Sequence, residues 1–178
     1  MNKPFLTVFT PAYNRAYTLP RTYESMKQQK NTDFIWLIVD DGSSDNTAEL
    51  VKQWQAENNG FEIRYIYKEN GGMHTAHNTA YENIHTELNT CIDSDDKLAP
   101  GAVRTILDKW EQVRDMGYAG IIALDSDFDG NVIVTTWGAE KNGVREVENE
   151  YTISPADFIM LLNLHQYLKE TGNPFPYI

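Results

Sequence analysis

The stretch that decides the fold is Phe34-Ile35-Trp36-Leu37-Ile38-Val39, which runs directly into Asp40-Asp41-Gly42-Ser43-Ser44-Asp45. Six consecutive apolar residues without polar alternation are typical of a parallel β-strand covered by helices on both faces. The abrupt change to acidic and small residues predicts that the strand ends there and that the chain turns at the edge of a sheet. The sequence therefore indicates an α/β protein.

The residues before this strand predict one strand and one helix. Phe5–Thr10 is rich in strand-forming residues, and Pro11 is expected to stop it. Thr18 is placed to cap a helix that has Pro20 in its first turn and runs to about Gln29. The first strand therefore delivers a polar loop to its carboxyl end.

The residues after it repeat the alternation of strand and helix. The predicted segments are a helix at 48–54, a strand at 61–67, a helix at 73–84, a strand running into 90–96, a helix at 103–113, strands at 120–124 and 131–137, and a helix at 154–168. This order is that of a doubly wound unit, a mainly parallel sheet with helices on both faces.

Composition bounds the class of protein. The 178 residues, 41% of them hydrophobic, are enough for one domain, which is expected to span residues 1–178. A net charge of −11 argues against a nucleic-acid surface. No stretch has the length of a membrane span, and Cys91 is the single cysteine, so a cytoplasmic protein is expected, in contact at most with the inner face of the membrane.

Three polar clusters follow apolar runs, at Tyr13-Asn14, at Asp40-Asp41 and at Asp93-Ser94-Asp95-Asp96. In a parallel sheet the carboxyl ends of the strands meet at one edge, where ligands collect, so these clusters are expected to lie together. Asp93 and Asp95 are two residues apart and project to the same side of an extended backbone, as two oxygen ligands of a divalent cation would. The alternative is a solvated acidic turn that caps the next helix.

Four motifs carry a resemblance to a known family. They are Pro11-Ala12-Tyr13-Asn14-Arg15, the run Val39–Thr47, Asn70-Gly71-Gly72 followed by Ala76-His77-Asn78, and Asp93–Asp96. Their order and spacing over residues 4 to 115 resemble the family-two glycosyltransferases, inverting nucleotide-sugar enzymes with the Rossmann-like GT-A fold. The resemblance implies a nucleotide-binding part at about 4–115 and the start of an acceptor-side part at about 116–178, with more of that part expected beyond the last residue.

The resemblance also implies roles for individual residues. Tyr13, in the loop with Pro11 and Asn14, would stack on uracil, and Asp41 would accept its imide N–H. Stacking on an aromatic ring and a charge-assisted hydrogen bond are both suited to a base. Tyr13 as a packing residue is the alternative. Asp40, in the same turn, has a structural alternative to a ligand contact. Its carboxylate would only hydrogen-bond loop amides, while Gly42 supplies the unusual backbone dihedrals of the turn.

The phosphates and the metal take the remaining motifs. Asn70, Gly71 and His77 would face the diphosphate and ribose. The family commonly has basic residues where this chain has Met73 and His77, so His77 is either a pH-dependent substitute or a helix-surface residue. By the same resemblance, Asp95 would ligate Mn²⁺ or Mg²⁺, with Asp93 near the ribose or the metal.

The expected function is transfer of a sugar from a nucleotide donor, UDP in the first instance, to a hydroxyl of a saccharide or lipid-linked acceptor in surface polysaccharide or glycoconjugate synthesis. The general base, normally Asp or Glu, is not assigned and is expected beyond Ile178. The alternatives are a module that binds the nucleotide sugar without transfer and a receiver-type signalling domain.

One further acidic stretch, Asp125-Ser126-Asp127-Phe128-Asp129-Gly130, resembles the start of a calcium loop and the nucleophile motif of haloacid-dehalogenase-like phosphatases. Position 12 of the calcium pattern is Thr136 instead of Glu, and the stretch comes after at least four predicted strands. We therefore interpret it as an acidic hairpin connection.

Overall fold

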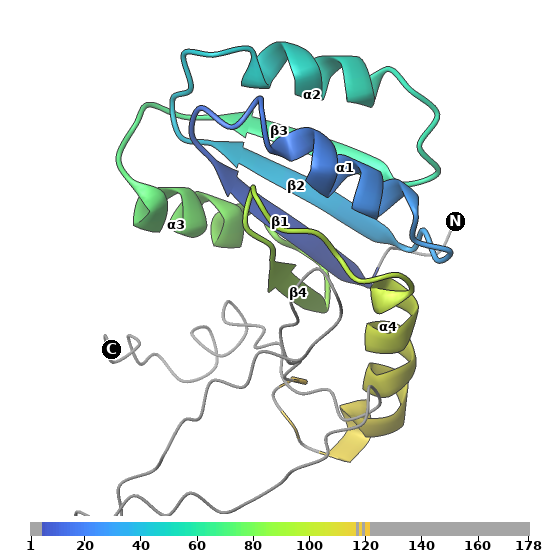
Figure 1. The fold of residues 1–178 in the computed structure, drawn as a ribbon. Coiled ribbons are helices and arrows are strands. Elements are labelled where there is room, and N and C mark those ends of the chain that lie inside the picture. The colour runs from blue at the N-terminus through green and yellow to red at the C-terminus, as the bar shows by residue number, and fades with distance from the viewer. Residues whose placement is uncertain (1–4, 117, 119, 122–178) are drawn as a thin grey trace, which may run out of the picture.

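A computed structural model describes residues 5–116, 118, 120 and 121 of the chain. Strands and helices alternate along it (Figure 1). The elements are β1 (Leu6–Ala12), α1 (Leu19–Lys27), β2 (Phe34–Asp40), α2 (Thr47–Gln55), β3 (Glu62–Tyr67), α3 (Met73–Asn83), β4 (Leu88–Cys91), α4 (Ala102–Val113) and the short 3₁₀ helix η1 (Arg114–Met116). None of the described helices has the length and apolar character needed to cross a membrane.

The four strands of the described residues form one parallel sheet in the order β3-β2-β1-β4. This order agrees with the 3-2-1-4 arrangement of Rossmann-type sheets. A receiver domain instead has the order 2-1-3-4-5, with its third strand beside the first. In this chain β3 pairs with β2, so the sheet topology argues against the receiver alternative.

β2 is buried along its whole length, as the apolar run predicted. Phe34, Trp36 and Ile38 point to one face, into a core shared with α1, α2 and α4. Leu37 and Val39 point to the other face, where α3 covers them with Ala76 and Ala80. The predicted α/β class, with a parallel sheet and helices on both faces, is therefore confirmed (Figure 1).

The prediction that Pro11 stops the first strand is wrong, because β1 continues to Ala12 and Pro11 pairs with Val39. The Ala12 carbonyl accepts from the Asp41 amide on the β2 side, so the backbone groups of Pro11 point to the opposite side. β4 has already ended there, since its last pair is Phe9 with Cys91. The missing N–H of proline therefore costs no ladder hydrogen bond.

The helix and strand boundaries agree with the predictions to within a few residues for most segments up to residue 113. The fourth strand differs, because β4 ends at Cys91 and the Asp96 amide donates to the Asp93 carbonyl, so Asp93 and Asp95 lie in a turn and not on an extended strand. The acidic connection at 125–130, the strand at 131–137, the helix at 154–168 and most of the strand at 120–124 lie outside the described residues. The division into a nucleotide-binding and an acceptor-side part stays a prediction.

Candidate functional site

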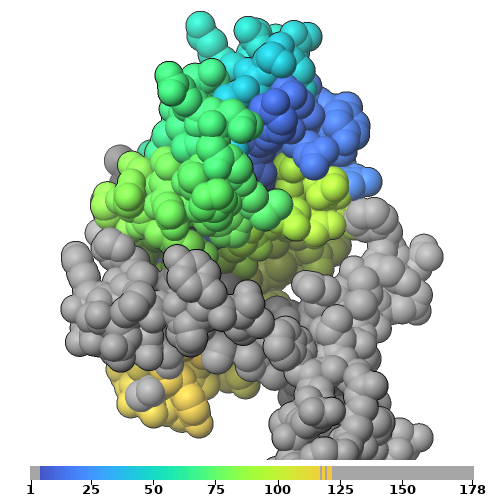
Figure 2. Space-filling view, turned by 90° about the vertical axis from the view of Figure 1, so that its left-hand side faces the viewer, coloured from blue at the N-terminus to red at the C-terminus, as the bar shows by residue number. Residues whose placement is uncertain are grey.

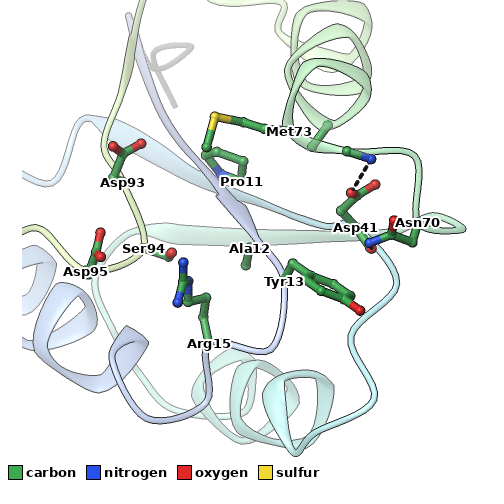
Figure 3. Close-up of a pocket in the computed structure, with 12 residues that line it drawn as sticks. Pro11, Ala12, Tyr13, Arg15, Asp41, Asn70, Met73, Asp93, Ser94 and Asp95 are labelled. Carbon is green, nitrogen blue, oxygen red and sulfur yellow. Dashed lines mark hydrogen bonds between the residues drawn. The ribbon is translucent and has the colours of Figure 1, made fainter.

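A cleft of about 530 Å³ lies at the carboxyl edge of the sheet (Figure 3). Figure 2 looks onto this edge, where the blue, green and yellow-green parts of the chain come together. The cleft is lined by Pro11, Ala12, Tyr13, Arg15, Asp41, Asn70, Gly72, Met73, Ala76, Asp93, Ser94 and Asp95. These residues follow β1, β2, β3 and β4, so the fold brings the predicted polar clusters to one place.

Asp41 is 3% exposed, and its carboxylate is bound by the loop that precedes α3. Oδ1 accepts from the Lys68 ammonium and from the Gly71 amide at 3.0 Å. Oδ2 accepts from the Gly72 amide at 2.8 Å (Figure 3). Burial alone would raise the pKa of Asp41, but these hydrogen bonds outweigh it and hold the pKa below its ordinary value. The carboxylate is therefore ionised and connects β2 to the start of α3.

Asp40 belongs to the interior of the same turn. It is fully buried, and its Oδ1 accepts from the Ser43 amide at 2.7 Å while Oδ2 accepts from the Tyr65 hydroxyl. Gly42 has φ +84°, and a Cβ there would lie 2.7 Å from the Asn70 amide nitrogen. Asp40 therefore stabilises the turn through hydrogen bonds, in agreement with its structural alternative. Gly42 permits the positive φ angle in the turn and the close approach of Asn70.

Asn14 connects the β1–α1 loop to the same turn. It has φ +53°, and its side-chain oxygen accepts from the amides of Ser44 at 2.8 Å and Asp45 at 3.3 Å. Its own amide donates to Ser43 Oγ at 2.8 Å. Asn14 does not line the cleft, and the contacts that it makes fix the two loops against each other.

Tyr13 lies in the cleft wall with half of its surface exposed. Asn70 lies across from it, and its side-chain amide donates to the Asp41 carbonyl at 2.9 Å (Figure 3). An exposed aromatic ring next to a buried carboxylate fits a flat, polar ligand such as a base better than it fits a packing role.

The acidic turn after β4 is held by its backbone. Thr22 Oγ1 donates to the Asp96 carbonyl at 2.7 Å, and the Arg21 guanidinium donates to the Asp95 carbonyl. Both donors lie on α1, so this helix fixes the path of the turn. The Asp93 and Asp95 side chains are exposed, and neither carboxylate accepts a hydrogen bond or forms an ion pair within the described part of the chain.

Two carboxylates at a cleft fit the oxygen chemistry of Mg²⁺ or Mn²⁺. Within residues 5–116, 118, 120 and 121, no three His, Cys, Asp or Glu side chains form a metal group. Mg²⁺ does not require one, because proteins usually hold it through one or two carboxylates together with substrate phosphates and water. The donor set of Asp93 and Asp95 therefore fits a cation shared with a phosphorylated ligand.

His77 lies on α3 over the sheet and does not line the cleft. Its ring packs edge-on against Phe9 at 5.3 Å, and its Nε2 is 4.0 Å from the Cys91 sulfur. Burial lowers the pKa of His77, although the Asp93 charge acts in the opposite direction. A packed ring of lowered pKa is a poor source of positive charge at neutral pH.

Six of the predicted site residues therefore line one cleft, namely Pro11, Tyr13, Asp41, Asn70, Asp93 and Asp95, whereas Asn14, Gly71 and His77 lie outside its lining. Gly71 still donates its amide to Asp41. The cleft also contains residues to which the sequence assigned no role, namely Ala12, Arg15, Gly72, Met73, Ala76 and Ser94. Arg15 and Gly72 belong to quoted motifs, and their adjacency to predicted residues was the available signal.

Sheet order 3-2-1-4, helices on both faces and an acidic cleft at the carboxyl edge define a Rossmann-like α/β protein of the GT-A type. Residues 7–163 match the family "Glycosyl transferase family 2". This match covers more than half of the chain, and the chain belongs to that family. Family membership confirms the resemblance and removes the receiver alternative.

Two bacterial relatives are longer proteins than this chain. The chondroitin synthase of Escherichia coli is 33% identical over 132 residues, which are 73% of this chain and 19% of that protein. A Campylobacter jejuni "GalNAc(5)-diNAcBac-PP-undecaprenol beta-1,3-glucosyltransferase" is 28% identical over 161 residues, 88% of this chain and 48% of that protein. The chain thus spans about a fifth to a half of these relatives.

Solved structures show the same fold. Residues 1–349 of S. aureus TarS in complex with UDP give a TM-score of 0.68 at 21% identity, over 96% of this chain and 50% of that one. The mannosyltransferase PcManGT of Pyrobaculum calidifontis, in complex with GDP-Man and Mn²⁺, gives 0.60 at 21% identity, over 71% of this chain and 36% of that one.

Proposed function

We propose that this chain is the donor-binding part of a glycosyltransferase that moves a sugar from a UDP-sugar to an acceptor hydroxyl with inversion, in the synthesis of a surface polysaccharide or glycoconjugate. Family membership supports the reaction class. The names of the Escherichia coli and Campylobacter jejuni relatives support the acceptor class. The UDP and UDP-GlcNAc complexes of TarS support the uracil nucleotide.

The observation that carries the proposal is the composition of the cleft. An exposed aromatic ring, a buried ionised carboxylate and two exposed carboxylates line one cavity. Its volume of about 530 Å³ lies in the range of small-molecule sites. A solvated acidic turn would not need the aromatic wall or the buried Asp41.

At the base end, Tyr13 stacks on the uracil ring and Asp41 accepts the imide N–H. A carboxylate offers about four acceptor positions. Oδ1 of Asp41 is bound by Lys68, Gly71 and, at 3.4 Å, the Thr75 hydroxyl. Oδ2 accepts from the Gly72 amide alone among the described residues, which leaves an acceptor position there for the base.

At the phosphate end, Asp95 and Asp93 hold Mn²⁺ or Mg²⁺ together with the diphosphate of the donor. The cation supplies charge neutralisation and Lewis-acid stabilisation of the departing diphosphate. The chain's own contribution is to hold two carboxylates at the cleft on a turn whose backbone α1 fixes through Arg21 and Thr22. The backbone that carries the two carboxylates is therefore fixed before the ligand arrives.

The acceptor hydroxyl also needs a general base. The carboxylates in the described lining of the cleft are Asp41, Asp93 and Asp95, and the roles above use all three. This observation favours, as a second candidate, a module that binds a nucleotide sugar without transferring it. A base from the remaining chain would make the site an enzyme.

The test is calorimetry of UDP binding with and without Mn²⁺, on the wild-type chain and on Asp95→Asn. We expect UDP to bind much more tightly with Mn²⁺ and the variant to lose this dependence. Equal UDP affinity with and without the cation would refute the metal site. Transfer of sugar from a UDP-sugar, measured in parallel, separates the enzyme from the binding module.

A further inference from the structure

Arg15 lies in the loop between β1 and α1, and its backbone is fixed at both ends. Its amide donates to Thr47 Oγ1 at 3.2 Å, and its carbonyl accepts from the Thr18 and Leu19 amides, each at 3.0 Å. The side chain extends into the cleft on the side of Ser94 and Asp95 (Figure 3). The loop therefore presents a guanidinium to the cleft from a rigid base.

The guanidinium of Arg15 is oriented by a neutral partner. Nη1 donates to the Tyr17 hydroxyl at 2.8 Å, and the guanidinium carbon lies 6.0 Å from the centre of that ring. The ion pairs of the described residues do not include Arg15, whereas Lys68 forms one with Asp41. The charge of Arg15 is thus held in place without being neutralised by a carboxylate.

The α3 residues that line the opposite side of the cleft, Met73 and Ala76, carry no charge. Met73, at the start of α3, is 65% exposed and uncharged, and His77 is packed against Phe9 with a lowered pKa. Arg15 is the one cationic side chain in the described lining of the cleft. An anionic ligand entering between Tyr13 and Asp95 passes this guanidinium.

We propose that Arg15 binds the diphosphate of the nucleotide donor, as the cationic contact that Met73 and His77 do not supply. This inference rests on the proposed function. A guanidinium presents paired N–H groups that match two phosphate oxygens, so it suits a diphosphate better than a point charge does. Tyr17 is the positioning residue, because its hydroxyl holds the Arg15 guanidinium in the cleft before the ligand binds.

The test compares three probes in the presence of Mg²⁺, namely UDP, uridine and inorganic pyrophosphate, by calorimetry or ligand-observed NMR. Because charged hydrogen bonds are lost, Arg15→Gln is expected to weaken UDP and pyrophosphate roughly 10-fold or more, and to leave uridine unchanged. Arg15→Lys keeps the charge but lacks the paired N–H groups of the guanidinium. Its affinities for UDP and pyrophosphate should lie between those of the wild type and Arg15→Gln. Tyr17→Phe should weaken UDP less than Arg15→Gln does, again without affecting uridine.

The matched control is Arg104→Gln on α4, which removes the same charge from an exposed ion pair with Asp108. It should leave all three affinities unchanged, which separates a contact from a change in net charge. Equal UDP and pyrophosphate affinities in Arg15→Gln and wild type would overturn the inference and leave the proposed function standing. Parallel loss of uridine affinity would also overturn it, because the residue would then only shape the cleft.

A wild-type chain that binds pyrophosphate but not UDP would refute the uracil donor alone, and Arg15 would then be tested on pyrophosphate. A wild-type chain that binds neither UDP nor pyrophosphate would refute the proposed function and, with it, this inference.

Discussion

Two acidic turns at the same edge of the sheet use their carboxylates in opposite ways. After β2, the side chains of Asp40 and Asp41 are buried and hydrogen-bonded to loop amides, Tyr65 and Lys68. After β4, the backbone of the turn is held by α1, and the Asp93 and Asp95 carboxylates are exposed. The carboxylates of the first turn hold loops together and leave one acceptor position of Asp41 for a ligand, whereas both carboxylates of the second turn remain available to a ligand.

The largest effect on stability is expected from Asp41→Ala. It leaves the partly buried Lys68 ammonium without its partner and removes the acceptor of the Gly71 and Gly72 amides. Breaking such a pair costs about 3 kcal/mol. Urea unfolding should show this loss. UDP binding should fall with it, because the loop before α3 is released and the proposed acceptor of the imide N–H is removed.

Asp33→Ala is the control for Asp41→Ala, since Asp33 is exposed and lies before β2. It should unfold like the wild type. If Asp41→Ala also unfolds like the wild type, the structural role assigned to the β2 turn is wrong.

Thr22→Val is expected to have a smaller effect, of about 1 kcal/mol. The variant keeps the shape of the side chain and removes the hydroxyl that donates to the Asp96 carbonyl. The turn after β4 should lose part of its fixed geometry, so Mn²⁺-dependent UDP binding should weaken as well. Thr79→Val is the control, because that hydroxyl donates within α3. If UDP binding keeps its full metal dependence in Thr22→Val, the α1 contacts do not fix the geometry of the metal site.

Acid should destabilise the chain through the β2 turn. The pKa values of Asp41 and Asp45 lie below their ordinary value because amide and hydroxyl donors, and Lys68 at Asp41, stabilise the charged form against burial. The unfolded state then binds more protons in acid, so this stabilisation is complete above the ordinary value of 3.8 and is lost as the pH falls below it. We would measure the free energy of unfolding in urea for the wild type and for Asp41→Asn between about pH 6 and about pH 3. It should fall less steeply with decreasing pH in the variant. Parallel profiles would contradict the assignment.

The smallest effect on stability is expected from Asp95→Asn, within about 0.5 kcal/mol. The Asp95 side chain is exposed, and it has no hydrogen-bonding partner in the described part of the chain. The same change should abolish the Mn²⁺ dependence of UDP binding. A loss of stability comparable to that of Asp41→Ala would show that the two turns do not differ as proposed.

The sequence predicted the elements well because each apolar run fills one strand and each polar cluster follows a strand. It could not reveal that the loop before α3 binds the Asp41 carboxylate, since Lys68, Gly71 and Gly72 lie 27, 30 and 31 residues further along the chain. The sequence also could not reveal that Arg21 and Thr22 on α1 bind the turn after β4, because their partners lie 74 residues further along the chain.

The position of Arg15 depends on three dimensions in the same way. Its motif identified the loop, but the direction of the side chain follows from backbone contacts with Thr47 and from Tyr17. Pro11 was misjudged for a related reason, because whether a proline ends a strand depends on which neighbour its nitrogen faces.

Pro11 has a consequence for the chain before it meets any ligand. β1 extends beyond the end of β4, so in the part of the chain that the structure describes no strand pairs with Pro11 on that side. Open edges with free N–H groups recruit strands from other chains and so promote aggregation. At Pro11 the group facing that side has no N–H to offer. Pro11, which lines the cleft, therefore offers an approaching strand no donor for pairing at this position.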